Sequence, residues 1–91
     1  MNGVTDNRER KRFELTENGM TAFANYLPRG DNDLLITHVE SPPALRGKGT
    51  ASRLMEGVAA IARSQGTRLT PLCSYAALWF RRHPDEADLL G

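Results

Sequence analysis

A large charge imbalance, paired cysteines and long apolar runs are all absent from this sequence of 91 residues. Twelve basic and eleven acidic residues leave a net charge of +1, so nothing in the charge calls for a nucleic acid or an anionic membrane as partner. The single cysteine, Cys73, excludes an internal disulfide framework and favours a reducing compartment. No apolar stretch approaches the roughly 20 residues that cross a bilayer, and the polar N-terminus lacks the apolar core of a signal peptide. We therefore expect a cytoplasmic protein, present as a monomer or weak dimer.

The length is that of one domain with a thin core. Residues 1–12 are polar and end in a charge cluster, so we expect a flexible lead-in followed by a single domain over residues 13–91. A basic cluster can bind phosphate, but Glu9 interrupts this one, and we interpret it as a solvated tail.

Apolar and polar residues alternate over residues 13–16, 20–27 and 34–40, which predicts three strands. Asn18 and Gly19 between the first two predict a tight hairpin. Apolar residues then recur at helical spacing from Thr50 to about Gly66. A short strand over residues 68–73 and a second helix, capped by Ser74 and ending near Arg82, complete the order β-β-β-α-β-α. This order predicts an α+β (mixed α/β) fold.

A glycine-rich loop, residues 46–51, lies between the third strand and the longest helix. Free backbone N–H groups and the helix dipole favour an anion at such a place. Two glycines allow a tight turn that lets phosphate approach the amides, and Arg46 and Lys48 add positive charge. A loop that uses its glycines only for turning is the alternative.

Two other phosphate motifs do not fit this loop. A Walker loop requires glycine where Pro42 stands and does not continue with a glycine such as Gly49. The dinucleotide-binding fingerprint requires a third glycine where Ser52 stands.

The loop Arg46-Gly47-Lys48-Gly49-Thr50-Ala51 resembles the pyrophosphate loop of the GNAT acyltransferase superfamily. With Pro42-Pro43 before it, and Pro71-Leu72-Cys73-Ser74-Tyr75 and Arg81-Arg82-His83-Pro84 after it, the chain is similar over roughly residues 7–90 to a subgroup of very short, single-domain GNAT-like proteins. The resemblance implies a minimal GNAT-like fold, with a mostly antiparallel central sheet flanked by helices, and acetyl-CoA or coenzyme A as cofactor. The cofactor-binding residues it implies are Ser41, Arg46, Gly47, Lys48, Gly49, Thr50, Ala51 and Tyr75.

The chain departs from this subgroup at three places. Ser41 replaces an apolar residue, Glu86 stands where an aromatic residue is usual, and Trp79 stands where a tyrosine is frequent. The first two changes leave cofactor binding largely intact. The third removes a phenolic proton donor.

Three residues are candidates for catalysis. Cys73 precedes a helix N-terminus, where a thiol becomes more acidic, and in the subgroup this cysteine lies near the acyl end of the cofactor; a buried, inert thiol is the alternative. His38 and Glu40 share one face of a regular strand and would form a base with its orienting carboxylate, or a solvated pair. One cysteine and two distant histidines do not make a metal site.

We expect an acetyl-CoA-dependent N-acetyltransferase acting on an amine of a protein, peptide or small molecule. The alternative is a module that binds coenzyme A or acyl-CoA without efficient turnover. The loop predicts binding in both cases, and only the acceptor side separates them.

Overall fold

A computed structural model describes residues 3–91 of the chain. Five strands form one sheet in the order β1-β2-β3-β4-β5. The strands are β1 (Thr5–Asn7), β2 (Arg12–Glu17), β3 (Met20–Arg29), β4 (Asp33–Glu40) and β5 (Arg68–Pro71). The first four are antiparallel neighbours, and β5 pairs with β4 in parallel. The expected mixed α+β class with a mostly antiparallel sheet is confirmed.

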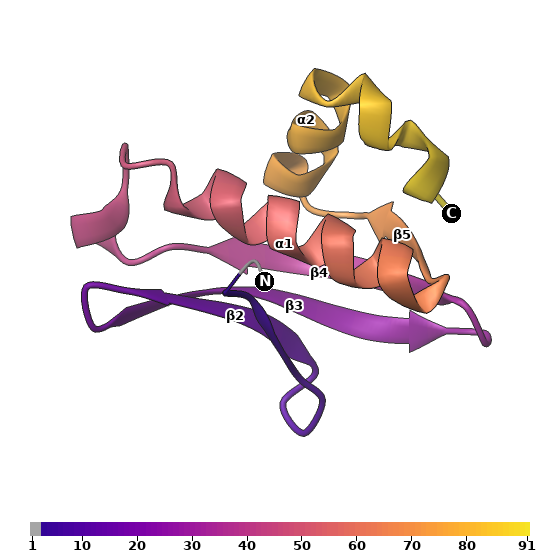
Figure 1. The fold of residues 1–91 in the computed structure, drawn as a ribbon, viewed down its shortest axis with the longest axis horizontal. Coiled ribbons are helices and arrows are strands. Elements are labelled where there is room, and N and C mark those ends of the chain that lie inside the picture. Colours follow the sequence, from indigo (N-terminus) through magenta and orange to yellow (C-terminus); the bar gives the residue numbers. More distant parts are fainter. Residues whose placement is uncertain (1–2) are drawn as a thin grey trace.

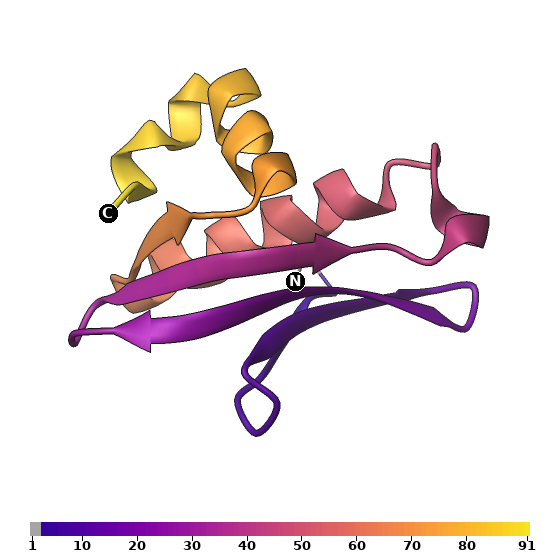
Figure 2. The ribbon, with the colours of Figure 1, turned by 180° about the vertical axis from the view of Figure 1, so that it is seen from behind.

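Two α-helices pack against this sheet, α1 (Thr50–Gln65) and α2 (Ser74–Arg82). Two 3₁₀ segments, Pro43–Leu45 and Pro84–Leu89, precede α1 and follow α2. Helix α1 lies over β2 and β3, and α2 contacts β4, β5 and the side of α1. In the view from behind, β3 and β4 lie in front of α1 and no helix covers them (Figure 2). The sheet therefore has one packed face and one open face.

The core lies between the sheet and the helices (Figure 1). Alternate side chains of β2 and β3 point into it while their neighbours face outward, as the pleat requires. The buried apolar residues of the strands are Phe13, Leu15, Ala22, Ala24, Tyr26, Ile36 and Leu69, and those of the two α-helices are Leu54, Met55, Val58, Ala59, Ala62, Ala76, Trp79 and Phe80. A domain of this length is too small for a second hydrophobic core, so its stability depends on these residues.

Strand β1 corrects the expected lead-in. Thr5 to Asn7 pair with β2, and the hydroxyl of Tyr26 donates a 2.6 Å hydrogen bond to Asp6. Burial, with a smaller contribution from this hydrogen bond, raises the pKa of Tyr26 to about 12. The observed order is therefore β-β-β-β-α-β-α, and only Met1 and Asn2 lie outside the described residues.

Local signals set the other element boundaries. Asn18 and Gly19 both have positive φ, 53° and 75°, as a tight hairpin turn requires. Gly66 ends α1 in the left-handed conformation. The predicted cap of α2 was wrong by one residue, because Cys73 is the N-cap and its sulfur accepts from the amide of Ala76 at 3.4 Å.

Candidate functional site

Strands β4 and β5 separate part of the way along the sheet. Their parallel pairing ends at Ile36 and Pro71. Just beyond, the amides of Leu72 and Cys73 both donate to the carbonyl of Ile36, at 2.9 and 3.2 Å. The chain then continues into α2 while β4 runs on to Glu40, so within residues 3–91 the last part of β4 has no paired strand on the β5 side.

A β-bulge in β4 accompanies this separation. Ile36 pairs with Tyr26 and His38 pairs with Asn25, so Thr37 is an extra residue in the strand. The bulge exchanges the two faces of the strand: the side chain of Ile36 points into the core before it, and that of His38 reaches the open face after it.

The unpaired end of β4 offers backbone groups at the opening. The amide of Tyr26 donates to the carbonyl of Lys11, the residue just before β2, so Tyr26 and the alternate residue Ala24 direct their backbone groups away from β4. Val39 lies opposite Ala24, and its N–H and C=O therefore point to the side that β5 has left. They are available to a ligand lying along β4.

The glycine-rich loop forms the second wall. Gly47 and Gly49 have φ of 78° and 79°, a left-handed conformation that glycine adopts without steric cost. Gly49 is the N-cap of α1 and provides no side-chain cap, and no acidic residue occurs in the first turn. The amides of Thr50, Ala51 and Ser52 are thus left without an intrahelical acceptor, and the positive end of the helix dipole is open.

A three-residue network fixes this loop to the β2–β3 hairpin. Glu17 accepts 2.8 Å bonds from Nε and Nη2 of Arg53 and a 2.6 Å bond from the hydroxyl of Thr50. These bonds lower the pKa of Glu17 to about 2. Arg53 also donates to the carbonyl of Lys48 at 2.9 Å. The network holds the loop in one conformation before any ligand arrives.

The cleft between the loop, β4 and α2 has a volume of about 470 Å³. It collects the sequence-predicted residues Ser41, Arg46, Gly47, Gly49, Thr50, Ala51 and Tyr75, together with His38 and Glu40. Lys48 and Cys73 do not line it. Sequence reasoning missed three of its lining residues, Val39, Leu45 and Ser52.

Positive charge lies beside this cleft. Arg46 and Lys48 are exposed, and neither forms an ion pair within residues 3–91. Arg53, by contrast, is engaged by Glu17. The two loop cations are therefore the ones free to meet an anion at the amides of α1.

Two hydroxyls in the cleft have contrasting surroundings. Thr50 is 1% exposed and its hydroxyl is directed to Glu17, so this residue contributes its amide and not its side chain. Ser41 Oγ is buried and has no hydrogen-bond partner among the described residues, which is unfavourable unless a ligand or water completes it.

The candidate catalytic residues are divided between two places. Nε2 of His38 lies 3.1 Å from Oε1 of Glu40, and both side chains are about half exposed on the open face of the sheet. This confirms the expected pairing of the two on one face. Cys73 is half-buried where β4 and β5 separate, with its sulfur engaged as the α2 cap. Tyr75, the second residue of α2, has its pKa raised by burial, so its hydroxyl keeps its proton at neutral pH.

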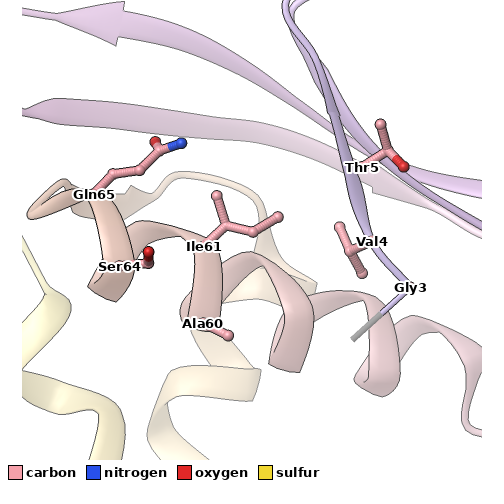
Figure 3. A pocket seen from close by; sticks show the side chains of 7 residues that line it. All are labelled: Gly3, Val4, Thr5, Ala60, Ile61, Ser64 and Gln65. Atoms are coloured by element: carbon pink, nitrogen blue, oxygen red, sulfur yellow. The ribbon is translucent and has the colours of Figure 1, made fainter. Parts of the chain in front are cut away.

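A second hollow, of about 510 Å³, lies between β1 and α1 (Figure 3). Its described lining residues are Gly3, Val4, Thr5, Ala60, Ile61, Ser64 and Gln65, none of them ionisable. It is slightly larger than the cleft, but its described lining has no charged side chain and no helix N-terminus. No cluster of metal-ligating side chains occurs within residues 3–91, and no helix in that range is long and apolar enough to span a membrane.

Parallel strands that separate, a left-handed glycine-rich loop and a helix N-terminus without a side-chain cap make this an α+β domain with a cleft suited to an anion. The family model of the GCN5-related N-acetyltransferases matches residues 12–89. The chain belongs to this family.

A solved structure gives the same fold. It is the solution structure of a Staphylococcus aureus protein described as a candidate GCN5-like N-acetyltransferase. The two chains are 18% identical and superpose with a TM-score of 0.69, over 97% of this chain and 86% of the other. At this identity the likeness concerns the fold alone. No curated protein sequence matches the chain significantly.

Proposed function

We propose that the protein is an acetyl-CoA-dependent N-acetyltransferase whose cofactor lies in the cleft between the glycine-rich loop and the free end of β4. One observation carries this proposal: the uncapped N-terminus of α1 and the unpaired backbone of β4 open into the same cleft. The first suits a pyrophosphate, and the second suits the amide groups of a pantetheine arm.

The residues of the cleft fit this cofactor. The first-turn amides of α1, with Arg46 and Lys48, would hold the pyrophosphate. The backbone of Val39 and the hydroxyl of Ser41 would form hydrogen bonds with the pantetheine arm. Ser41 Oγ is buried and has no hydrogen-bond partner among the described residues, so a bond from a ligand would satisfy it. Tyr75 lies across the cleft and would pack against the arm.

Bound acetyl-CoA supplies an activated thioester, and the chain must bring a neutral amine beside it. His38 and Glu40 are the groups on the open face that would take the amine proton. Tyr75 is protonated and would be able to return a proton to the departing thiolate. Cys73, at the point where β4 and β5 separate, would act as an acyl carrier only if its sulfur left the amide of Ala76.

The open face favours a large acceptor or an acceptor that is only loosely held. No helix within residues 3–91 covers it (Figure 2), and Leu27 of β3, next to buried Tyr26 on the strand, is 50% exposed. A protein or peptide amine fits such a surface better than a small amine, which needs an enclosing pocket.

A coenzyme A-binding module without efficient turnover is the second candidate function. It is favoured by the use of Cys73 as a helix cap and by the half-exposed His38–Glu40 pair, which lacks the burial that usually tunes a catalytic base.

Two measurements made together separate these functions. Calorimetric titration with coenzyme A measures binding, and a coenzyme A-release assay against a panel of amines and peptides measures transfer. Binding with acceptor-dependent release supports the enzyme, and binding without release supports the module. Gly49→Asp, which places a carboxylate in the anion site, serves as the negative control. Absence of binding by the unaltered protein would refute both.

A further inference from the structure

Ser52 is the third residue of α1 and lines the cleft beside the glycine-rich loop. Its side chain has one recorded hydrogen bond, in which Nε1 of Trp79 lies 3.2 Å from its Oγ. The bond joins the first turn of α1 to the middle of α2, across 27 positions of sequence.

The direction of this bond is fixed by chemistry. An indole N–H donates and never accepts, so the oxygen of Ser52 must be the acceptor. The hydroxyl proton of Ser52 is therefore not used in this bond and can be donated to another acceptor. A serine in a helix often donates to the carbonyl four residues before it, here that of Lys48, but that carbonyl accepts from Arg53 at 2.9 Å, and no bond to it from Ser52 is formed within residues 3–91.

The other hydroxyl of the same turn has no such freedom. Thr50 donates its proton to Glu17 at 2.6 Å and lies close to Nη2 of Arg53. Of the two hydroxyls in the first turn of α1, that of Ser52 is therefore the one that can still donate a hydrogen bond.

Trp79 is well placed to fix the orientation of Ser52. Its side chain is 3% exposed, its ring meets Phe80 edge-on at 5.1 Å, and it stacks on His83 at 4.0 Å. Nδ1 of His83 is 2.7 Å from the carbonyl of Trp79. Because the indole cannot turn, the lone pair that it occupies on Ser52 Oγ is fixed. The hydroxyl proton must take another direction around that oxygen, and Ser52 is one of the residues that line the cleft.

We propose that Ser52 donates a hydrogen bond from its hydroxyl to the cofactor pyrophosphate, and that Trp79 is the positioning residue that directs this hydroxyl. The inference rests on the proposed function and adds to the backbone amides of the turn a side-chain donor. A donor next to a phosphate oxygen forms a charge-assisted bond, stronger than a neutral one. Trp79 stands where the similar short GNAT-like proteins frequently have a tyrosine. In this proposal it has a part in cofactor binding.

Calorimetric titration with coenzyme A and with 3′-dephospho-coenzyme A tests this proposal. Both ligands keep the pyrophosphate, so Ser52→Ala should weaken both by the same factor of about ten, equivalent to about 1.4 kcal/mol. Ser52→Thr, which keeps the hydroxyl, should bind within about threefold of the unaltered protein. Equal affinities of Ser52→Ala and the unaltered protein for both ligands would overturn the proposal.

A double-mutant cycle tests the part of Trp79. Trp79→Phe keeps an aromatic ring and removes the donor, so it should weaken coenzyme A binding several-fold, and adding Trp79→Phe to Ser52→Ala should cost little more. Additive losses would overturn the positioning role. If the bond only ties α1 to α2, Ser52→Ala lowers the thermal midpoint and leaves the affinity unchanged, which refutes the proposal without touching the proposed function. Failure of the unaltered protein to bind either ligand overturns both.

Discussion

Replacing Gly49 by alanine changes the glycine-rich loop at its most constrained point. The residue has φ of 79° and ψ of 7° as the N-cap of α1, and an L-residue in this conformation costs about 1–2 kcal/mol. The added Cβ would also lie 3.0 Å from Nη1 of Arg53. The guanidinium must shift by a few tenths of an ångström, which loosens its bonds to Glu17 and to the carbonyl of Lys48.

Gly66 provides the matched control at the other end of the same helix. Its φ is 69°, and a Cβ there would meet nothing within 4 Å. Gly49→Ala and Gly66→Ala should therefore lower the free energy of unfolding by similar amounts and the thermal midpoint by about 4–16 °C each. Only Gly49→Ala should weaken coenzyme A binding, by about tenfold or more.

Thermal unfolding followed by circular dichroism, with calorimetric titration of the two folded variants, measures both effects. Equal losses of coenzyme A affinity in the two variants would show that the loop has no special part in binding. A Gly49→Ala variant with unchanged thermal midpoint would refute the argument from its backbone conformation.

Three further predictions concern Glu17, Cys73 and the His38–Glu40 pair. Because bonds from Arg53 and Thr50 depress the pKa of Glu17 from 4.5 to about 2, its stabilising effect is complete above pH 4.5 and is lost as the pH falls through about 2. The difference in thermal midpoint between the unaltered protein and Glu17→Gln should shrink over that range, and a difference independent of pH would refute this account. Cys73→Ala should destabilise α2 by about 0.5 kcal/mol through loss of its cap, while Cys73→Ser keeps the cap. If Cys73 carries the acyl group, mass spectrometry should detect one acetyl group on it after acetyl-CoA is added, and turnover that survives Cys73→Ala unchanged would leave it as a cap alone. His38→Gln should lower kcat by about 10²-fold if the histidine is the base, with coenzyme A affinity unchanged; an unaltered kcat would remove the pair from catalysis.

Local sequence signals were sufficient for most of the elements. Alternation predicted β2, β3 and β4, and the glycine that ends α1 lies where the helical spacing stops. Strand β1 gave no such signal because its three residues are polar. It is held by pairing with β2 and by the bond from Tyr26 to Asp6, which are contacts made only in the folded chain.

The glycine-rich loop could be predicted because its chemistry is contained in six consecutive residues. The bulge at Thr37 could not, since it depends on the register of β4 against β3 and not on composition. The bonds from Arg53 to Glu17 and from Trp79 to Ser52 join positions about 30 residues apart, and nothing in the local sequence marks either pair. Sequence therefore located the candidate anion site, and the structure shows which contacts hold its loop in place.

The central claim, that coenzyme A binds between the loop and the free end of β4, is tested most directly by amide NMR during titration with acetyl-CoA. We expect the largest shifts on residues 46–52 and on residues 39–41, while the amides around Gly66 and the hollow between β1 and α1 change little. Saturable shifts confined to that hollow, or to the open face of β2 and β3, would contradict it.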